Sequence, residues 1–403
     1  MSGTPPVSDA RAGPLEAALA ARLEPGRRFF EAEAERLARI CHQMAERFAR
    51  GGRLLGLATT AAERSDARHV AVEFVHPVIV GKRALPALAL TGETGSLALE
   101  VELLARPEDI ALGFGSDEQL HAALETARER GCLTVAFQRG LGAAHVLEPP
   151  SEDPFVRQEL VETLYHVLWE LVHVFFEHRG LLSGRAERRR HDAGASAFLY
   201  PFLDERESEL EPVLDDVRRS ALMKSTEVGE LRAQTLREGA GELAAGGAAL
   251  RERLERGGKL LALGNGGSAT DAMDVVADFR CPPSRLGLAP RPALDLTADP
   301  SILTAIANDI GVEAIFLRQV IAYAQDGDTL LALSTSGNST NVIAALREAR
   351  GRGLLTIALV GYDGGRVAAE RLADHVIITR SQHIPRIQEA QASAYHALRE
   401  LVG

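Results

Sequence analysis

The chain has 403 residues, of which 46% are hydrophobic and 25% are charged, the balance of a globular protein of two or three domains. Its 45 basic and 56 acidic residues give a net charge of −11, which argues against general binding to a nucleic-acid backbone. No run approaches the roughly 20 apolar residues that span a membrane, so we expect a cytoplasmic protein with neither a nucleic-acid nor a membrane partner.

The sequence repeats itself. Residues 51–57, Gly-Gly-Arg-Leu-Leu-Gly-Leu, return at residues 257–263 as Gly-Gly-Lys-Leu-Leu-Ala-Leu. Near the two ends of the repeat, Gln158-Glu159 and Tyr165-His166 recur as Gln388-Glu389 and Tyr395-His396 with the same spacing. Two copies of one folding unit are therefore predicted.

Each copy is of ordinary domain size. Between the copies lies a stretch with a basic run, small residues and an acidic run, a composition typical of a linker. The predicted organisation is a flexible N-terminus (1–26), a first domain (27–180), a linker (181–224) and a second domain (225–403).

Short apolar runs alternate with helical patterns in the second copy. Helical periodicity covers Asp271–Phe279 and Asn341–Arg350, and a last helix runs from about residue 385 to 401. Four runs have the composition of buried strands, namely Leu260–Leu263, Thr329–Leu333, Thr356–Val360 and His375–Thr379. This alternation predicts an α/β fold with a doubly wound parallel sheet, which binds ligands outside the carboxyl ends of its strands.

Two loops of the second copy combine glycines with hydroxyl side chains where a strand ends and a helix begins. The first is Gly264-Asn265-Gly266-Gly267-Ser268, whose glycines permit positive φ and close backbone approach. The second is Ser334-Thr335-Ser336-Gly337-Asn338-Ser339, whose hydroxyls and amides can donate to phosphoryl oxygens. One such loop is typical of a capped turn, whereas two together predict a phosphate clamp. Neither carries the lysine of a nucleotide-binding P-loop, so a sugar phosphate is the expected ligand.

These loops, with Asn308-Asp309 and Arg386-Ile387-Gln388-Glu389, resemble the sugar isomerase (SIS) domain of phosphoheptose isomerases. The resemblance covers the second copy and, more faintly, the first. It implies two tandem, flavodoxin-like SIS domains that form a pseudo-dimer, with a degenerate first copy. It also implies an isomerase that converts sedoheptulose 7-phosphate to glycero-manno-heptose 7-phosphate, in a homo-oligomer that is a pseudo-dimer or a dimer of pseudo-dimers.

The resemblance also implies which residues bind the substrate, a small-molecule sugar phosphate. Most belong to the two loops, and Asn308 and Asp309 would lie near the sugar hydroxyls. The full set is Asn265, Gly266, Gly267, Ser268, Asn308, Asp309, Ser334, Thr335, Ser336, Ser339 and Gln388.

Members of the family bind zinc through a His and a Glu four residues apart after the first loop, and a Gln and a His eight apart on the final helix. In the second copy Gln388 and His396 match the final pair, but Asp274 and Asp278 stand in place of the first. Two aspartates would move the preference from zinc toward magnesium or manganese.

The first copy has the complementary defect. His69 and Glu73 stand at the family's ligand positions, and Gln158 and His166 complete the foursome. Its two loops, residues 58–64 and 113–118, instead carry acidic side chains that would repel phosphate, namely Glu63, Asp117 and Glu118. We therefore predict one site shared between the copies.

The ligand set implied for zinc is His69, Glu73, Gln388 and His396, with Asp274, Asp278, Gln158 and His166 as alternates. The sequence does not decide between the two final-helix pairs. Isomerisation needs a base next to a carbonyl and an acid for the oxygens. Glu73, or failing that Asp278, would move the proton, with His396 as partner. A sugar-phosphate-binding regulator without catalysis, and an isomerase for another sugar phosphate, are the alternatives.

Overall fold

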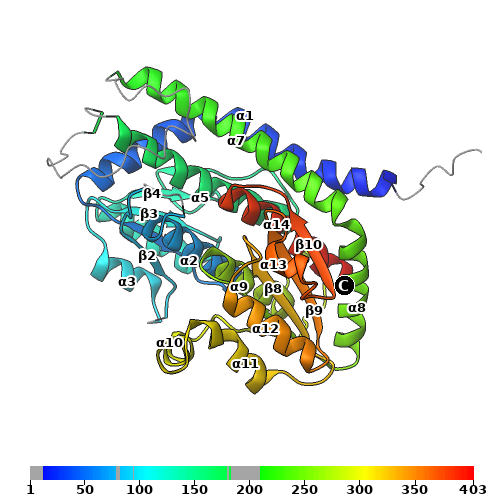
Figure 1. Cartoon of the computed structure of the whole chain (residues 1–403). Coiled ribbons are helices and arrows are strands. Elements are labelled where there is room, and N and C mark those ends of the chain that lie inside the picture. The colour runs from blue at the N-terminus through cyan, green and yellow to red at the C-terminus, as the bar shows by residue number, and fades with distance from the viewer. Residues whose placement is uncertain (1–11, 79–81, 94, 179–180, 183–208) are drawn as a thin grey trace, which may run out of the picture.

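Two five-stranded parallel sheets of the same topology form the centre of the molecule (Figure 1). The computed structural model describes residues 12–78, 82–93, 95–178, 181–182 and 209–403. The first sheet has the order β2-β1-β3-β4-β5, with β1 (Leu54–Leu57), β2 (Ala87–Leu90), β3 (Ile110–Gly113), β4 (Leu133–Ala136) and β5 (His145–Val146). The second has the corresponding order β7-β6-β8-β9-β10, with β6 (Leu260–Leu263), β7 (Ala293–Asp295), β8 (Thr329–Ser334), β9 (Leu355–Gly361) and β10 (His375–Thr379).

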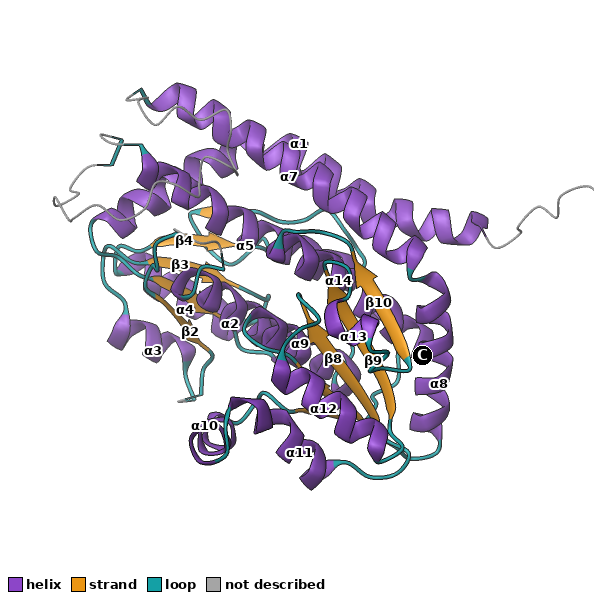
Figure 2. Cartoon of the chain, viewed as in Figure 1, coloured by secondary structure: helices purple, strands orange, loops and turns teal. Residues whose placement is uncertain are grey.

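Helices connect the strands and cover both sheets (Figure 2). The first half contains α1 (Ala12–Ala49), α2 (Ala61–Val75), α3 (Leu97–Leu104), α4 (Glu118–Glu129) and α5 (Pro154–Glu177). After it come α7 (Leu210–Glu238) and α8 (Ala240–Glu255), and then α9 (Gly267–Arg280), α10 (Pro300–Asp309), α11 (Ile315–Tyr323), α12 (Thr340–Gly351), α13 (Gly365–Ala369) and α14 (Ile384–Val402). Short 3-10 turns occupy Ser284–Leu286 and Val312–Ala314. None of the helices in the described ranges is long and apolar enough to cross a membrane.

Successive side chains of the central strands are buried on opposite faces of each sheet. In β6, Leu260 and Ala262 join one buried cluster, while Leu261 and Leu263 join another. In β1, Leu54 and Leu55 divide in the same way. Because both faces are covered by helices, these strands are apolar at every position, as parallel strands usually are.

The predicted α/β fold class is confirmed. The predicted strands of the second copy coincide with β6, β8, β9 and β10, and the predicted helices with α9, α12 and α14, to within a few residues at each end. A local contact also recurs in both halves. Asp109 accepts from the amide of Arg53, and Asp328 accepts from the amide of Lys259.

The structure differs from the predicted organisation at two boundaries. Residues 12–26, predicted to belong to a flexible N-terminus, form the first turns of α1, and residues 210–224, predicted as linker, form the first half of α7. These two long helices lie side by side (Figure 1). Both segments are helical because residues such as Leu19, Val213 and Val217 are buried against the rest of the protein. This packing is a tertiary effect, which the local amino-acid composition does not indicate. The remaining residues of those predictions, 1–11 and 183–208, lie outside the described residues.

Two of the helix pairs that join the halves lie beside the candidate site residues. Helix α2 packs on α9, and α5 packs on α14. A buried ionic network crosses this interface, in which Glu170 of α5 accepts from Arg386 of α14 at 3.0 Å and pairs with Lys224 of α7. Burial alone would raise the pKa of Glu170, but Arg386 and Lys224 outweigh it and hold the pKa at about 2.

Replacement of Glu170 should therefore destabilise the interface. A Glu170→Gln variant removes the buried carboxylate that Arg386 and Lys224 share, while Arg386 keeps its pair with Glu389, so we expect the free energy of unfolding to fall by about 3 kcal/mol. The loss should be present above the ordinary glutamate pKa and should shrink as the pH falls toward 2, since the carboxylate itself becomes protonated there. Urea unfolding measures the loss, and the control is Glu370→Gln, which removes solvent-accessible ion pairs with Arg347 and Arg366. Equal effects of the two substitutions would contradict this account.

Candidate functional site

The glycine loop lies between β6 and α9 and depends on its glycines for shape. A Cβ on Gly264 would lie 2.1 Å from the carbonyl oxygen of Ser268, so only glycine fits. Gly266 has φ +57°, which also favours glycine. The tight loop directs the N-terminus of α9, with the positive end of the helix dipole, toward the space beside it, an arrangement suited to an anion.

The serine loop lies beside it, between β8 and α12. Ser334 accepts from the amide of Gly337 at 3.1 Å, and its hydroxyl lies 3.4 Å from that of Ser339. The two loops are joined by Asn265 and Asn341, whose side-chain amides exchange hydrogen bonds of 2.9 Å in both directions. The two predicted phosphate loops are thus held at adjacent strand ends of one sheet.

Side chains from the first half reach the glycine loop. An added Cβ on Gly267, the first residue of α9, would lie 2.7 Å from Nε2 of His69 on α2 and 2.0 Å from Nε2 of Gln388 on α14. His69 and Gln388 therefore lie against the start of the helix that follows the loop.

His69, Glu73, His166 and Gln388 form what we call the composite cluster, because they come from both halves. Nε2 of His69 lies 3.3 Å from Nε2 of His166, 3.3 Å from Nε2 of Gln388 and 3.9 Å from Oε1 of Glu73. All four side chains are buried. Oε2 of Glu73 and Oε1 of Gln388 have no hydrogen-bond partner in the described part of the chain.

The partners of the two imidazoles suit a cation at the centre of the composite cluster. Nδ1 of His166 lies 3.0 Å from Oε1 of Glu389, to which it donates, and in the neutral ring Nε2 would then carry a lone pair. With its proton on Nδ1, His69 would donate to the hydroxyl oxygen of Tyr165 at 3.0 Å and present a second Nε2 lone pair. Two lone pairs 3.3 Å apart repel unless a cation lies between them. Two imidazoles with a carboxylate and an amide, backed by hydrogen-bonded outer partners, are a donor set that suits zinc.

Burial disfavours the charged forms of His69 and Glu73. Burial, with a smaller contribution from His166, holds the pKa of His69 well below its ordinary value. Burial also raises the pKa of Glu73 to about 7, against the pull of His166. Two further carboxyls, Asp271 and Glu162, have their pKa raised well above the ordinary range, first by burial and then by neighbouring acids. Neutral imidazole is the form that binds metals.

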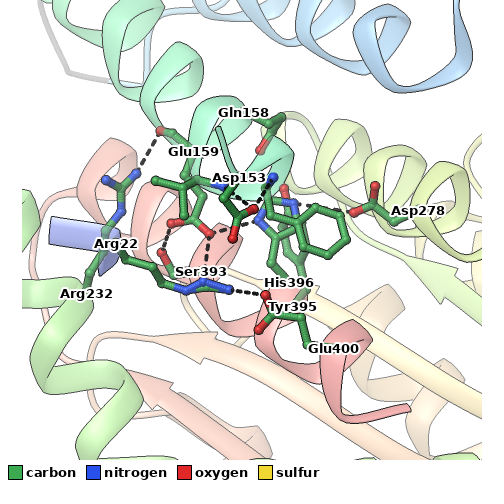
Figure 3. Close-up of polar contacts among 12 residues, drawn as sticks. Arg22, Asp153, Gln158, Glu159, Arg232, Asp278, Ser393, Tyr395, His396 and Glu400 are labelled. Carbon is green, nitrogen blue, oxygen red and sulfur yellow. Dashed lines mark hydrogen bonds and ion pairs between the residues drawn. The ribbon is translucent and has the colours of Figure 1, made fainter. Parts of the chain in front are cut away.

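A second cluster, which we call the aspartate cluster, contains Asp274, Asp278 and His396. Nε2 of His396 lies 3.4 Å from Oδ2 of Asp278 and 3.8 Å from Oδ2 of Asp274, and its Nδ1 lies 3.0 Å from Oε1 of Glu159 (Figure 3). Burial alone would lower the pKa of His396, but Asp278 and Glu159 raise it to about 10. Burial and Asp278 raise the pKa of Asp274 to about 7.

The structure groups the predicted ligands differently from the sequence analysis. Gln388 meets His166, not His396, and His396 lies with the two aspartates. The reason is the distance between the two side chains along the axis of α14. Gln388 and His396 share one face of α14, but eight residues at 1.5 Å each place them about 12 Å apart along the helix, so one final helix does not supply both donors to one ion.

Other predicted residues take varied positions. Ser268 and Ser334 are buried, while Thr335, Ser336 and Ser339 are half-buried at the serine loop. Asn308 and Asp309 are exposed at the end of α10, where Asn308 donates to Asp309 at 2.8 Å. Gln158 donates to Asp66 at 3.2 Å.

Four functional residues were missed by sequence reasoning. Asn341 joins the loops, Glu389 orients His166, and Tyr165 and Asp271 lie beside Nδ1 of His69, the latter at 3.6 Å. One signal could have found Glu389. It follows Gln388 directly, and Glu159 follows Gln158 in the other copy, where it orients His396 in the same way.

The chain is similar to known proteins over part of its length. Residues 225–361 match the family model described as "SIS domain". A phosphoheptose isomerase from Nitratidesulfovibrio vulgaris is 40% identical over 187 residues, which are 46% of this chain and 88% of that protein. One from Geobacter sulfurreducens is 47% identical over 168 residues, 41% of this chain and 86% of that protein.

A solved structure matches nearly the whole chain. The C-terminal domain of glucosamine-fructose-6-phosphate aminotransferase from Francisella tularensis has a TM-score of 0.61 at 9% identity and covers 95% of this chain and 93% of its own. At that identity the likeness shows the fold alone, and it includes both halves.

Gly267 offers a test of the composite cluster. In a Gly267→Ala variant the new methyl group would displace Gln388 and His69, so we expect zinc affinity to fall about 10- to 100-fold. Gly351→Ala is the matched control, because nothing lies within 4 Å of the added Cβ. Titration of both metal-stripped variants with zinc makes the measurement. Unchanged affinity in Gly267→Ala would show that zinc does not depend on this cluster.

Proposed function

The chain belongs to the phosphoheptose isomerase family, and on that premise we propose that it interconverts sedoheptulose 7-phosphate and glycero-manno-heptose 7-phosphate at one site built from both halves. One observation carries the proposal. His69 of the first half and Gln388 of the second lie together against Gly267, at the start of the helix that follows the glycine loop. The phosphate loops and the candidate metal ligands are therefore neighbours.

The two loops would bind the phosphate group. Ser268, Ser334, Thr335, Ser336 and Ser339 offer hydroxyl groups, and the N-terminus of α9 supplies a favourable dipole. The corresponding loops of the first half would not do so. Glu63 lies within 3.5 Å of an added Cβ on Gly115, and Asp117 accepts from Thr59, so carboxylates fill that end of the first sheet. We therefore assign a single substrate site to each chain.

His69, Glu73, His166 and Gln388 would hold the zinc ion. Their unpartnered oxygens and facing imidazole nitrogens support this assignment. When bound, zinc would supply charge stabilisation for an enediolate oxygen. Glu389 and Tyr165 would hold the two imidazoles in the required orientation.

Glu73 is the group that we assign to proton transfer. It would take a proton from C1 of the ketose and return it to C2, while the O1 proton moves to O2. Glu73 is buried in the composite cluster, and its Oε2 has no hydrogen-bond partner in the described part of the chain, which leaves that oxygen available for a proton. His166 takes the role of partner acid or base that the sequence analysis gave to His396, because it is His166 that lies in the composite cluster.

Substitution of His69 tests this function. In a coupled assay with sedoheptulose 7-phosphate, with zinc added or chelated, we expect His69→Ala to lower kcat/KM about 10²- to 10⁴-fold. His121→Ala, which changes a surface histidine on α4, is the control and should match wild type. An Asp274→Ala variant that loses activity as fully, while His69→Ala keeps it, would contradict the proposal. Tight binding of the sugar phosphate without turnover in the wild type would instead support the regulatory alternative.

A further inference from the structure

We propose that the aspartate cluster is a second, separate metal site, which binds a hard divalent cation of the Mn²⁺ type through Asp274, Asp278 and His396 and takes no sugar phosphate. The cluster lies at the interface of the halves, where α9 and α14 meet the start of α5. Such an ion would be structural and would link α9 to α14.

The donor atoms are placed for one ion. One ligand atom from each of the three side chains lies within 4.8 Å of the others. Two donors on one ion with bonds of about 2.1 Å lie about 3 to 4.2 Å apart, and Nε2 of His396 lies 3.4 and 3.8 Å from the two carboxylate oxygens. His396 is 1% exposed, and neither its Nε2 nor Oδ2 of Asp278 has a hydrogen-bond partner in the described ranges.

The surroundings of the cluster orient these donors. Nδ1 of His396 donates to Glu159, which Arg22 and Ser393 also hold (Figure 3). A histidine that ligates a metal usually donates its other nitrogen to a carboxylate in this way. Asp274 is fixed as well, since it accepts from the hydroxyls of Tyr395 at 2.8 Å and Ser65 at 3.1 Å. The two hydroxyl groups that donate hydrogen bonds to Asp274 thus come from different halves of the chain.

The types of ligand atom favour a different metal here from the zinc assigned to the composite cluster. The composite cluster contains two imidazoles, while the aspartate cluster contains one imidazole and two carboxylates, a harder set that suits manganese or magnesium. Mn²⁺ is the better match of these two because one donor is an imidazole nitrogen. A substrate phosphate is excluded by Glu63 and Asp117 in the neighbouring loops of the first half.

Metal content distinguishes the two sites. The full chain is stripped with a chelator, reloaded with zinc and manganese together, and desalted, and the ions retained per chain are counted by mass spectrometry. Electron paramagnetic resonance reports the manganese environment. We expect one zinc and one manganese per chain, with His69→Ala losing only zinc.

Asp278→Asn should lose manganese, with at least a tenfold loss of apparent affinity, and retain zinc. Asp274→Asn is the second variant, and near-ultraviolet circular dichroism checks that each variant is folded. Asp363→Asn, in the exposed turn before α13, is the matched control and should keep both ions. Wild-type chain that retains no manganese would overturn the proposal and leave a cluster of ion pairs around a protonated His396. Retention by both aspartate variants would overturn it too.

The outcome is separable from that of the proposed function. Manganese binding that persists in a chain without isomerase activity still supports the second site, and isomerase activity in a chain that binds no manganese still rejects it.

Discussion

The rise of an α-helix along its axis is the constraint on which both clusters depend. A glutamine and a histidine eight residues apart lie on one face of their helix but about 12 Å apart along it. The composite cluster therefore needs donors from both final helices, α5 and α14, whereas the aspartate cluster takes its donors from α9 and α14 and only an orienting carboxylate from α5. Gln388 of α14 lies with His166 of α5, and Glu159 of α5 orients His396 of α14. The first half alone does not complete the composite cluster, and the three ligands of the aspartate cluster, all from the second half, depend on Glu159 of the first half for the orientation of His396.

The two halves have kept different parts of one arrangement. The first half retains His69 and Glu73, and the second retains the glycine and serine loops. Such losses are tolerable only where the halves stay together. The buried ion pair between Glu170 and Arg386 has that effect, and it continues through Glu389 to His166 in the composite cluster. Stability of the interface and geometry of the site thus depend on the same side chains.

Much of the fold could be read from the sequence, and less of the site. The strands β6 and β10 and the two loops follow from local apolar runs and glycine spacing, which are properties of consecutive residues. The pairing of Gln388 with His166 does not, because it depends on how α5 packs on α14. The helical state of residues 12–26 depends in the same way on packing against α7. Asn308 and Asp309 fit the motif by position, and they lie exposed on α10.

The central claim is that the one active site takes its final-helix glutamine from the second half. Two matched variants, Gln388→Ala and Gln158→Ala, remove corresponding glutamines from α14 and α5, and the direct measurement is the zinc bound per chain, with isomerase rate as a second readout. The account predicts that Gln388→Ala loses zinc and activity, since Gln388 lies 3.3 Å from His69, while Gln158→Ala keeps its zinc. Loss of zinc in Gln158→Ala with retention in Gln388→Ala would contradict it.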